Sequence, residues 1–173
     1  DRIRPILVKA FTTSRVDSFR PEMRRIANDL IDRFIDQGRA DLVADFCHEY
    51  QISVISQFVG MSGEDVPDVA SATMHLRMLG QKPFEPGMPV LEKALRFLYG
   101  HISQVLAERR AGPPQDDFLG ALIDLWDGED QLTESELIWS VSFLLLGGHD
   151  TTRYTLAGCL ISILDAGMWE ALA

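Results

Sequence analysis

A run of small, acidic and hydroxyl-bearing residues interrupts the most apolar segment of the chain. It reads Gly147-Gly148-His149-Asp150-Thr151-Thr152, and leucine-rich stretches flank it on both sides. Adjacent glycines cost a helix interior about 1 kcal/mol each relative to alanine, and a buried carboxylate needs a partner. Because a carboxylic acid beside hydroxyls can move protons in a site shielded from water, this run is the first candidate for chemistry.

Helical geometry separates the side chains of this run onto different faces. At about 100° per residue, the glycines and threonines gather within an arc of roughly 140°, whereas His149 and Arg153 point away and Asp150 lies at the flank. The arc contains Gly147, Gly148, Thr151, Thr152, Thr155 and Gly158. Missing Cβ atoms let a bulky ligand approach the backbone, although close packing of two helices through small residues explains the glycines alone equally well.

The element that must position this run is predicted to be one long helix over about residues 134–165. Thr133 and Glu136 have the spacing of a capping box at its start. No proline interrupts the apolar pattern before Gly167, which favours a single uninterrupted helix.

The rest of the chain predicts an all-α fold. Apolar residues at helical spacing predict helices over 21–37, about 46–59, 90–110 and about 117–126, with a helical turn ending near Phe11 and another helix beginning at Ser62. Residues 81–89 hold three prolines and a glycine and are predicted to form a loop. A brief strand over 41–43 is the single exception.

Composition limits the classes of function. The 173 residues suffice for one domain, and we interpret 1–173 as a single partial domain truncated at both ends. A net charge of −10 argues against nucleic-acid binding, and no apolar run is long enough to span a membrane. Two isolated cysteines fit a reduced, cytoplasmic setting. Asp45 and His48 have the spacing of half a carboxylate–histidine metal pair, but matching partners on other helices are missing, so no metal site is predicted. The other three histidines, His75, His101 and His149, are expected to be structural or solvent-facing.

Basic residues concentrate near the start of this acidic chain. Residues 1–25 hold seven of them against three acids. They are Arg2, Arg4, Lys9, Arg15, Arg20, Arg24 and Arg25. Such a face is most simply a solvated surface, and the alternative is a docking site for an acidic protein.

The run at 147–152 resembles the (Ala/Gly)-Gly-x-(Asp/Glu)-Thr-(Thr/Ser) signature of the cytochrome P-450 family, the haem-thiolate monooxygenases. Three further stretches resemble bacterial members in the same order: residues 9–16 with Phe19-Arg20-Pro21, then 40–46, then 55–61. The resemblance covers nearly the whole chain and implies the central helical part of that fold.

The resemblance also implies a site and its ligands. The cofactor would be haem b, with dioxygen as co-substrate, electrons ultimately from a nicotinamide cofactor through a ferredoxin-type partner, and a small apolar organic substrate. Arg4 would pair with a haem propionate, Gly147 and Gly148 would line the oxygen pocket with Thr152 nearby, Thr151 would hydrogen-bond the bound oxygen, and Asp150 would relay protons. Residues 74–88 would cover the substrate channel.

Two departures from the family pattern keep an alternative open. The family's Phe-x-x-Gly-x-x-x-Cys-x-Gly loop and its Glu-x-x-Arg helix do not follow the threonine run in these residues, and Pro5 replaces a more usual basic residue. Cys47 and Cys159 are expected to be buried core thiols, so no metal ligand is assigned. The alternative is a non-enzymatic helical ligand-binding or scaffold protein derived from the same fold. A helical effector-binding domain of a regulator is a weaker alternative, because no DNA-binding module is present.

Overall fold

All regular structure in the described residues is helical. The computed structural model describes residues 2–80, 87–127 and 132–172. Its α-helices are α1 (Ile3–Ala10), α2 (Thr13–Ser18), α3 (Arg20–Asp32), α4 (Glu49–Phe58), α5 (Val66–Leu76), α6 (Met88–Ala111), α7 (Phe118–Asp127), α8 (Glu134–Asp165) and α9 (Trp169–Leu172). Three 3-10 turns, η1 (Ile35–Gln37), η3 (Gly63–Asp65) and η4 (Arg77–Gly80), and a π-helix, η2 (Leu42–His48), lie between them.

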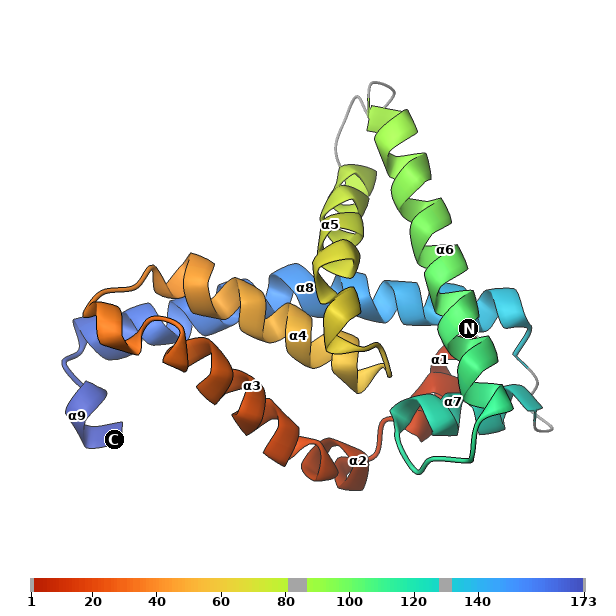
Figure 1. Ribbon diagram of the computed structural model, residues 1–173, viewed down its shortest axis with the longest axis horizontal. Helices are drawn as coiled ribbons and strands as arrows, with labels where there is room; N and C mark the ends of the chain where they lie inside the picture. The colour runs from red at the N-terminus through yellow and green to blue at the C-terminus, as the bar shows by residue number, and fades with distance from the viewer. Residues whose placement is uncertain (1, 81–86, 128–131, 173) are drawn as a thin grey trace.

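The long helix α8 is the element around which the others assemble, and it has the predicted bounds. It runs along the long axis of the molecule (Figure 1), where α4, α5, α6, α7 and η2 all contact it. The predicted capping box begins it: the Glu136 N–H donates to Thr133 Oγ1 over 3.2 Å, and the Thr133 N–H donates to the Glu136 carboxylate over 2.8 Å.

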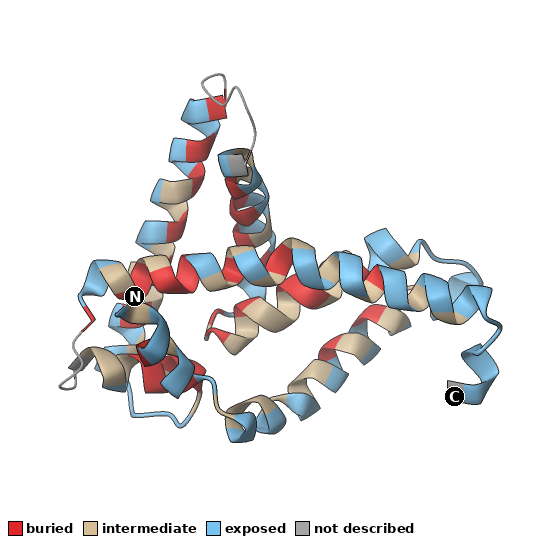
Figure 2. Ribbon diagram, turned by 180° about the vertical axis from the view of Figure 1, so that it is seen from behind, coloured by how far each residue is buried: buried red, intermediate tan, exposed pale blue. Residues whose placement is uncertain are grey.

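The core lies under the first half of α8, and the second half is largely exposed (Figure 2). Above this core α5 and α6 rise side by side as an arch, while α4 lies along α8 and α3 packs against α4 (Figure 1). The buried side chains that join α6, α7 and α8 are Leu98, Ile102, Leu106, Phe118, Leu119, Leu122, Leu137, Ile138, Val141 and Leu145. One face of α8 is therefore fixed by packing, and its far half is left open.

Two sequence predictions about local structure are wrong, one in the kind of element and the other at its boundary. The strand expected over 41–43 is the start of the π-helix η2, because the Asp41 carboxylate accepts from the N–H groups of Val43 and Ala44 over 3.0 and 3.1 Å and so caps a helix. The loop expected over 81–89 lies outside the described residues at 81–86. At its end Met88 and Pro89 already belong to α6, since proline is favourable in the first turn of a helix.

The two cysteines have different surroundings. Cys47 is fully buried in η2, as expected, but Cys159 is exposed, because nothing described packs against that side of the second half of α8. In the described part of the chain, no helix combines the length and apolar character needed to cross a membrane.

Candidate functional site

The glycine–acid–threonine run divides into an open face and a packed face of α8. Gly147, Thr151 and Thr152 are exposed, as are Thr155 and Gly158 further along. His149, on the opposite side, is only 2% exposed. Apart from Gly148, the arc deduced from helical spacing is thus an open surface in the described structure, and the residues predicted to point away from it face the protein.

The hydroxyl groups of the open face are bonded back to the helix. Thr151 Oγ1 donates to the Gly147 carbonyl over 2.6 Å, and Thr155 Oγ1 donates to the Thr151 carbonyl over 2.8 Å. Such bonds are weak competitors of the helical pattern and can be exchanged for a bond to a ligand. The Thr151 hydroxyl can therefore turn from the carbonyl toward a group placed on the open face.

The two glycines of the run have different neighbours. A Cβ atom on Gly148 would lie 2.9 Å from Ile55 Cγ1 of α4, whereas one on Gly147 would meet nothing within 4 Å. Gly148 thus permits close packing of α4 on α8, which is the helix-packing alternative considered for the glycines. Gly147 leaves its space open on the same side as Thr151.

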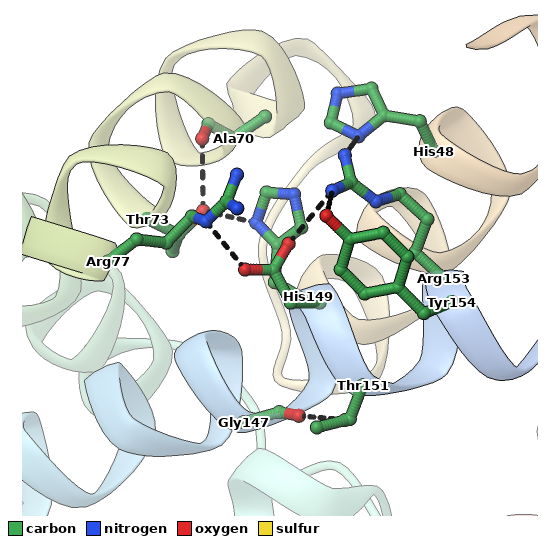
Figure 3. A network of polar contacts seen from close by, with 10 residues as sticks. His48, Ala70, Thr73, Arg77, Gly147, His149, Thr151, Arg153 and Tyr154 are labelled. Atoms are coloured by element: carbon green, nitrogen blue, oxygen red, sulfur yellow. Dashed lines mark hydrogen bonds and ion pairs between the residues drawn. The ribbon is translucent and has the colours of Figure 1, made fainter. Parts of the chain in front are cut away.

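Asp150 is held by two arginines at the edge between the two faces. Its Oδ2 lies 2.8 Å from Arg77 Nε at the end of α5, and its Oδ1 lies 3.2 Å from Arg153 Nη2 one turn along α8 (Figure 3). Arg153 also donates to the Tyr154 hydroxyl over 2.8 Å and lies 3.4 Å from His48 Nδ1 of η2. The carboxylate is partly exposed, so it lies between solvent and the packed interior.

His149 makes a buried polar contact with α5. Its Nδ1 lies 2.9 Å from Thr73 Oγ1, and both residues are buried. Burial lowers the pKa of His149 to about 4; His48, Arg153 and Arg77 act in the same direction, and Asp150 opposes them. Sequence reasoning had placed His149 among the structural or solvent-facing histidines, and had no signal for Thr73 or Arg77.

A cleft extends the open face toward α1. It has a volume of about 630 Å³ and is lined by Ile3, Arg4, Leu7, Ser135, Glu136, Trp139, Ser140, Phe143 and Leu144. Ser140 and Leu144 point within about 20° of the direction of Thr151 around α8. The cleft at Arg4 and the face at Gly147 and Thr151 therefore lie along one side of the same helix.

Comparisons with known proteins agree on one family, although no profile of a protein family matches the chain. The chain is 33% identical over 163 residues to "Cytochrome P450 107B1" of Saccharopolyspora erythraea, covering 94% of this chain and 38% of that protein. It is 31% identical over 157 residues to "Mycinamicin IV hydroxylase/epoxidase" of Micromonospora griseorubida, covering 90% of this chain and 38% of that protein.

Solved structures give the same result for the fold. The LnmA cytochrome P450 hydroxylase of Streptomyces atroolivaceus superposes with a TM-score of 0.82 at 28% identity, over 99% of this chain and 43% of that one. The chain matches bacterial cytochromes P450 along nearly its whole length. It spans about two fifths of the length of the P450 relatives that it matches.

The cleft residues fit the P450 cofactor. Apolar walls from Leu7, Trp139 and Leu144 suit a porphyrin ring, and Arg4, which has no ion-pair partner among the described residues, suits its carboxylates. A metal ligand is a separate matter. Within the described ranges no group of three or more His, Cys, Asp or Glu side chains could hold an ion, and neither cysteine lines the cleft.

Proposed function

We propose that this chain forms the oxygen-activating part of a haem-dependent monooxygenase that oxidises a small apolar organic substrate. The observation that carries the proposal is the single open side of α8, on which the Arg4 cleft, Gly147 and Thr151 follow one another. Haem b would lie on this side with a propionate at Arg4. Gly147, Gly148 and Thr152 would border the space above it.

When bound, the haem supplies the binding of dioxygen and the insertion of one oxygen atom into the substrate, the other atom leaving as water. Gly147 keeps the space beside Thr151 free of side chains. With the haem bound, the Thr151 hydroxyl would turn from the Gly147 carbonyl and donate its hydrogen bond toward that space. A hydroxyl is well suited to supply a proton there at neutral pH because it stays protonated.

Asp150 is the residue that connects this hydroxyl to solvent in the proposal. Its carboxylate is partly exposed, and the two arginines leave it at the edge of the open face. We infer that the carboxylate takes protons from water at the surface and passes them toward Thr151.

The electron donors, the iron ligand and the substrate class are inferred from the P450 resemblance and from the electron balance of the reaction. Insertion of one oxygen atom consumes two electrons, which would come ultimately from a nicotinamide cofactor through a ferredoxin-type protein. The thiolate that would hold the iron is proposed to come from the part of the P450 sequence that these residues do not cover. The substrate would be an apolar organic molecule. Of the lid residues in 74–88, Leu76 is buried and Met74, Leu79 and Met88 are exposed, while Phe84 lies outside the described residues.

The proposal is tested on the full-length protein. We expect purified protein to hold about one haem per chain, to show the spectrum of a thiolate-ligated iron, and to lose haem more readily after Arg4→Ala than after the control Lys93→Ala on α6. A protein that folds and binds apolar ligands without haem would instead support the non-enzymatic alternative. Equal haem retention in both variants would remove Arg4 from the site.

A further inference from the structure

A buried polar contact joins the arch to the glycine–acid–threonine run. Thr73 of α5 and His149 of α8 are 76 positions apart in the sequence, yet Thr73 Oγ1 lies 2.9 Å from His149 Nδ1 (Figure 3). Thr73 is 0% exposed and His149 is 2% exposed. A hydrogen bond in such a place is strongly directional and costly to break, because water cannot replace the lost partner.

The surroundings of the contact determine which atom donates. Thr73 Oγ1 lies 2.9 Å from the Val69 carbonyl and 3.0 Å from the Ala70 carbonyl, both of which can only accept. A hydroxyl has one proton, so a hydroxyl that donates to these carbonyls accepts from the ring. His149 Nδ1 therefore carries a hydrogen atom.

The same surroundings keep the ring neutral. Burial disfavours the imidazolium most, and the positive charges of Arg153 on α8 and Arg77 at the end of α5, together with His48 on η2, add to this. Asp150 is the one facing group that favours the cation. A neutral ring protonated at Nδ1 satisfies the Thr73 hydroxyl without placing a third cation beside two arginines.

The contact also fixes the position of Arg77. Thr73 and Arg77 are one helical turn apart at the end of α5, and His149 and Asp150 are adjacent on α8. The side chain of Arg77 is 42% exposed, and an ion pair that exposed contributes only about 0–1 kcal/mol by itself. Of the two polar contacts, the buried bond is therefore better able than the ion pair to fix how α5, whose Val69, Ala72 and Leu76 share the core with α8, lies against α8.

We propose that His149 is a positioning residue: as a neutral donor from Nδ1 to Thr73, it fixes α5 on α8 and so holds Arg77 beside Asp150. The proposal rests on the proposed function only for the use that the enzyme makes of Asp150. The contact and its effect on the Arg77–Asp150 pair are independent of that use.

The first test is the state of the ring in the full-length, haem-loaded protein. With ¹⁵N-labelled histidine, long-range ¹H–¹⁵N correlation spectra distinguish the two neutral forms and the cation, and the His149 signals are those absent from His149→Asn. We expect a neutral ring protonated at Nδ1 at pH 7. A ring protonated at Nε2, or a charged ring, would overturn the proposal.

The second test measures whether the buried contact controls the ion pair. The coupling between Arg77 and Asp150 is obtained from a double-mutant cycle of Arg77→Met and Asp150→Asn in urea unfolding, repeated with Thr73→Val and with Thr73→Ser. Valine has the shape of threonine without the hydroxyl, whereas serine keeps the hydroxyl. We expect the coupling to fall by at least half with Thr73→Val and to persist with Thr73→Ser.

Variants of His149 make the same distinction from the other side. Asparagine can place an N–H group near the position of Nδ1, whereas leucine fills similar space without a donor, so His149→Asn should retain the Arg77–Asp150 coupling and His149→Leu should lose it. Equal coupling in the valine and serine backgrounds means that Thr73 and His149 only fill space, and it refutes the proposal. Unchanged peroxide release by Thr151→Ala would refute the proposed function instead and leave this inference standing.

Discussion

The adjacent glycines of the run, Gly147 and Gly148, have different surroundings, so the lack of a side chain has a different effect at each position. Gly148 lies against Ile55 of α4, while the space beside Gly147 is open in the described structure. A Cβ atom at 2.9 Å from Ile55 Cγ1 forces the Ile55 side chain or one of the two helices to shift, whereas a Cβ atom at Gly147 meets nothing and favours the helix. Gly148 thus permits packing, and Gly147 leaves open the space that the proposed function assigns to a ligand.

Alanine at each glycine should separate these two effects. We expect Gly148→Ala to lower the free energy of unfolding by about 1–3 kcal/mol, and Gly147→Ala to leave it unchanged or raise it by up to about 1 kcal/mol. Urea unfolding of the full-length protein measures both. Ile55→Ala combined with Gly148→Ala should cost less than the sum of the single changes. Equal losses at the two glycines would show that the close approach of α4 is not what constrains Gly148.

His149 should make stability depend on pH. Its pKa is about 4 in the folded protein against 6.5 as a reference, so below pH 6.5 the unfolded chain takes up a proton that the folded protein does not. Stability therefore falls as the pH decreases from about 6.5 to about 4, by about 3 kcal/mol in total, and His149 adds no further loss below pH 4. Unfolding free energies measured across this range should decline less steeply in His149→Asn than in the natural protein. Parallel curves for the two proteins would contradict the low pKa.

The sequence indicates some of these residues and not others, for a physical reason. The small and hydroxyl-bearing residues of the open face are neighbours on one helix, so spacing alone places Gly147, Thr151 and Thr155 together. Thr73 and Arg77 reach the same run from another helix. Their positions depend on how α5 packs, which no local pattern contains.

At the scale of the helices, a boundary could be predicted from the sequence where a recognisable local signal marks it. The bounds of α8 follow from a capping box at Thr133 and Glu136 and a glycine after its end, all local signals. The sequence prediction of a strand at the start of η2 is wrong because three residues cannot show a period. Its actual signal is the pair Asp41 and Asp45: the Asp41 carboxylate caps the first turn, and the Asp45 carboxylate accepts from the Asp41 N–H over 2.8 Å.

The cap at Asp41 should matter beyond its own turn. We expect Asp41→Ala to lower the free energy of unfolding by about 1 kcal/mol, and Asp41→Asn to lower it less because the amide oxygen still accepts. Hydrogen exchange should quicken over 42–48 in the alanine variant. Since η2 contacts α8 and carries His48, exchange around His149 should quicken as well. Faster exchange confined to η2 would mean that the two elements are not coupled.

At the scale of the whole molecule, ion pairs reduce the positive charge that the first 25 residues present to solvent. Several basic side chains of the first 25 residues are neutralised locally: Arg2 pairs with Glu136, Arg20 with Asp17, and Arg25 with Glu22 and Asp29. The positive surface that remains for a partner protein is therefore weaker than the number of basic residues in the sequence indicates. Docking of an acidic ferredoxin on this surface stays a prediction.

Its test is the salt dependence of electron transfer. The rate at which a reduced ferredoxin reduces the haem-loaded protein should fall several-fold between about 0.05 and 0.5 M salt, because screening shortens the reach of surface charges. Lys9→Glu should lower the rate at low salt, and Lys93→Glu on the arch should not. A rate that is indifferent to salt, or equal effects of the two changes, would place the partner elsewhere.

The measurement that bears most directly on the proposed function is the fate of electrons in Thr151 variants of the full-length protein. Electron donor consumed, product formed and hydrogen peroxide released are compared in the natural protein, Thr151→Ser and Thr151→Ala. We predict that serine, which keeps the hydroxyl, stays close to the natural protein, while alanine diverts most of the electrons to peroxide. If alanine forms product with the same yield per electron as threonine, the open face of α8 does not deliver the proton and the account of this site is wrong.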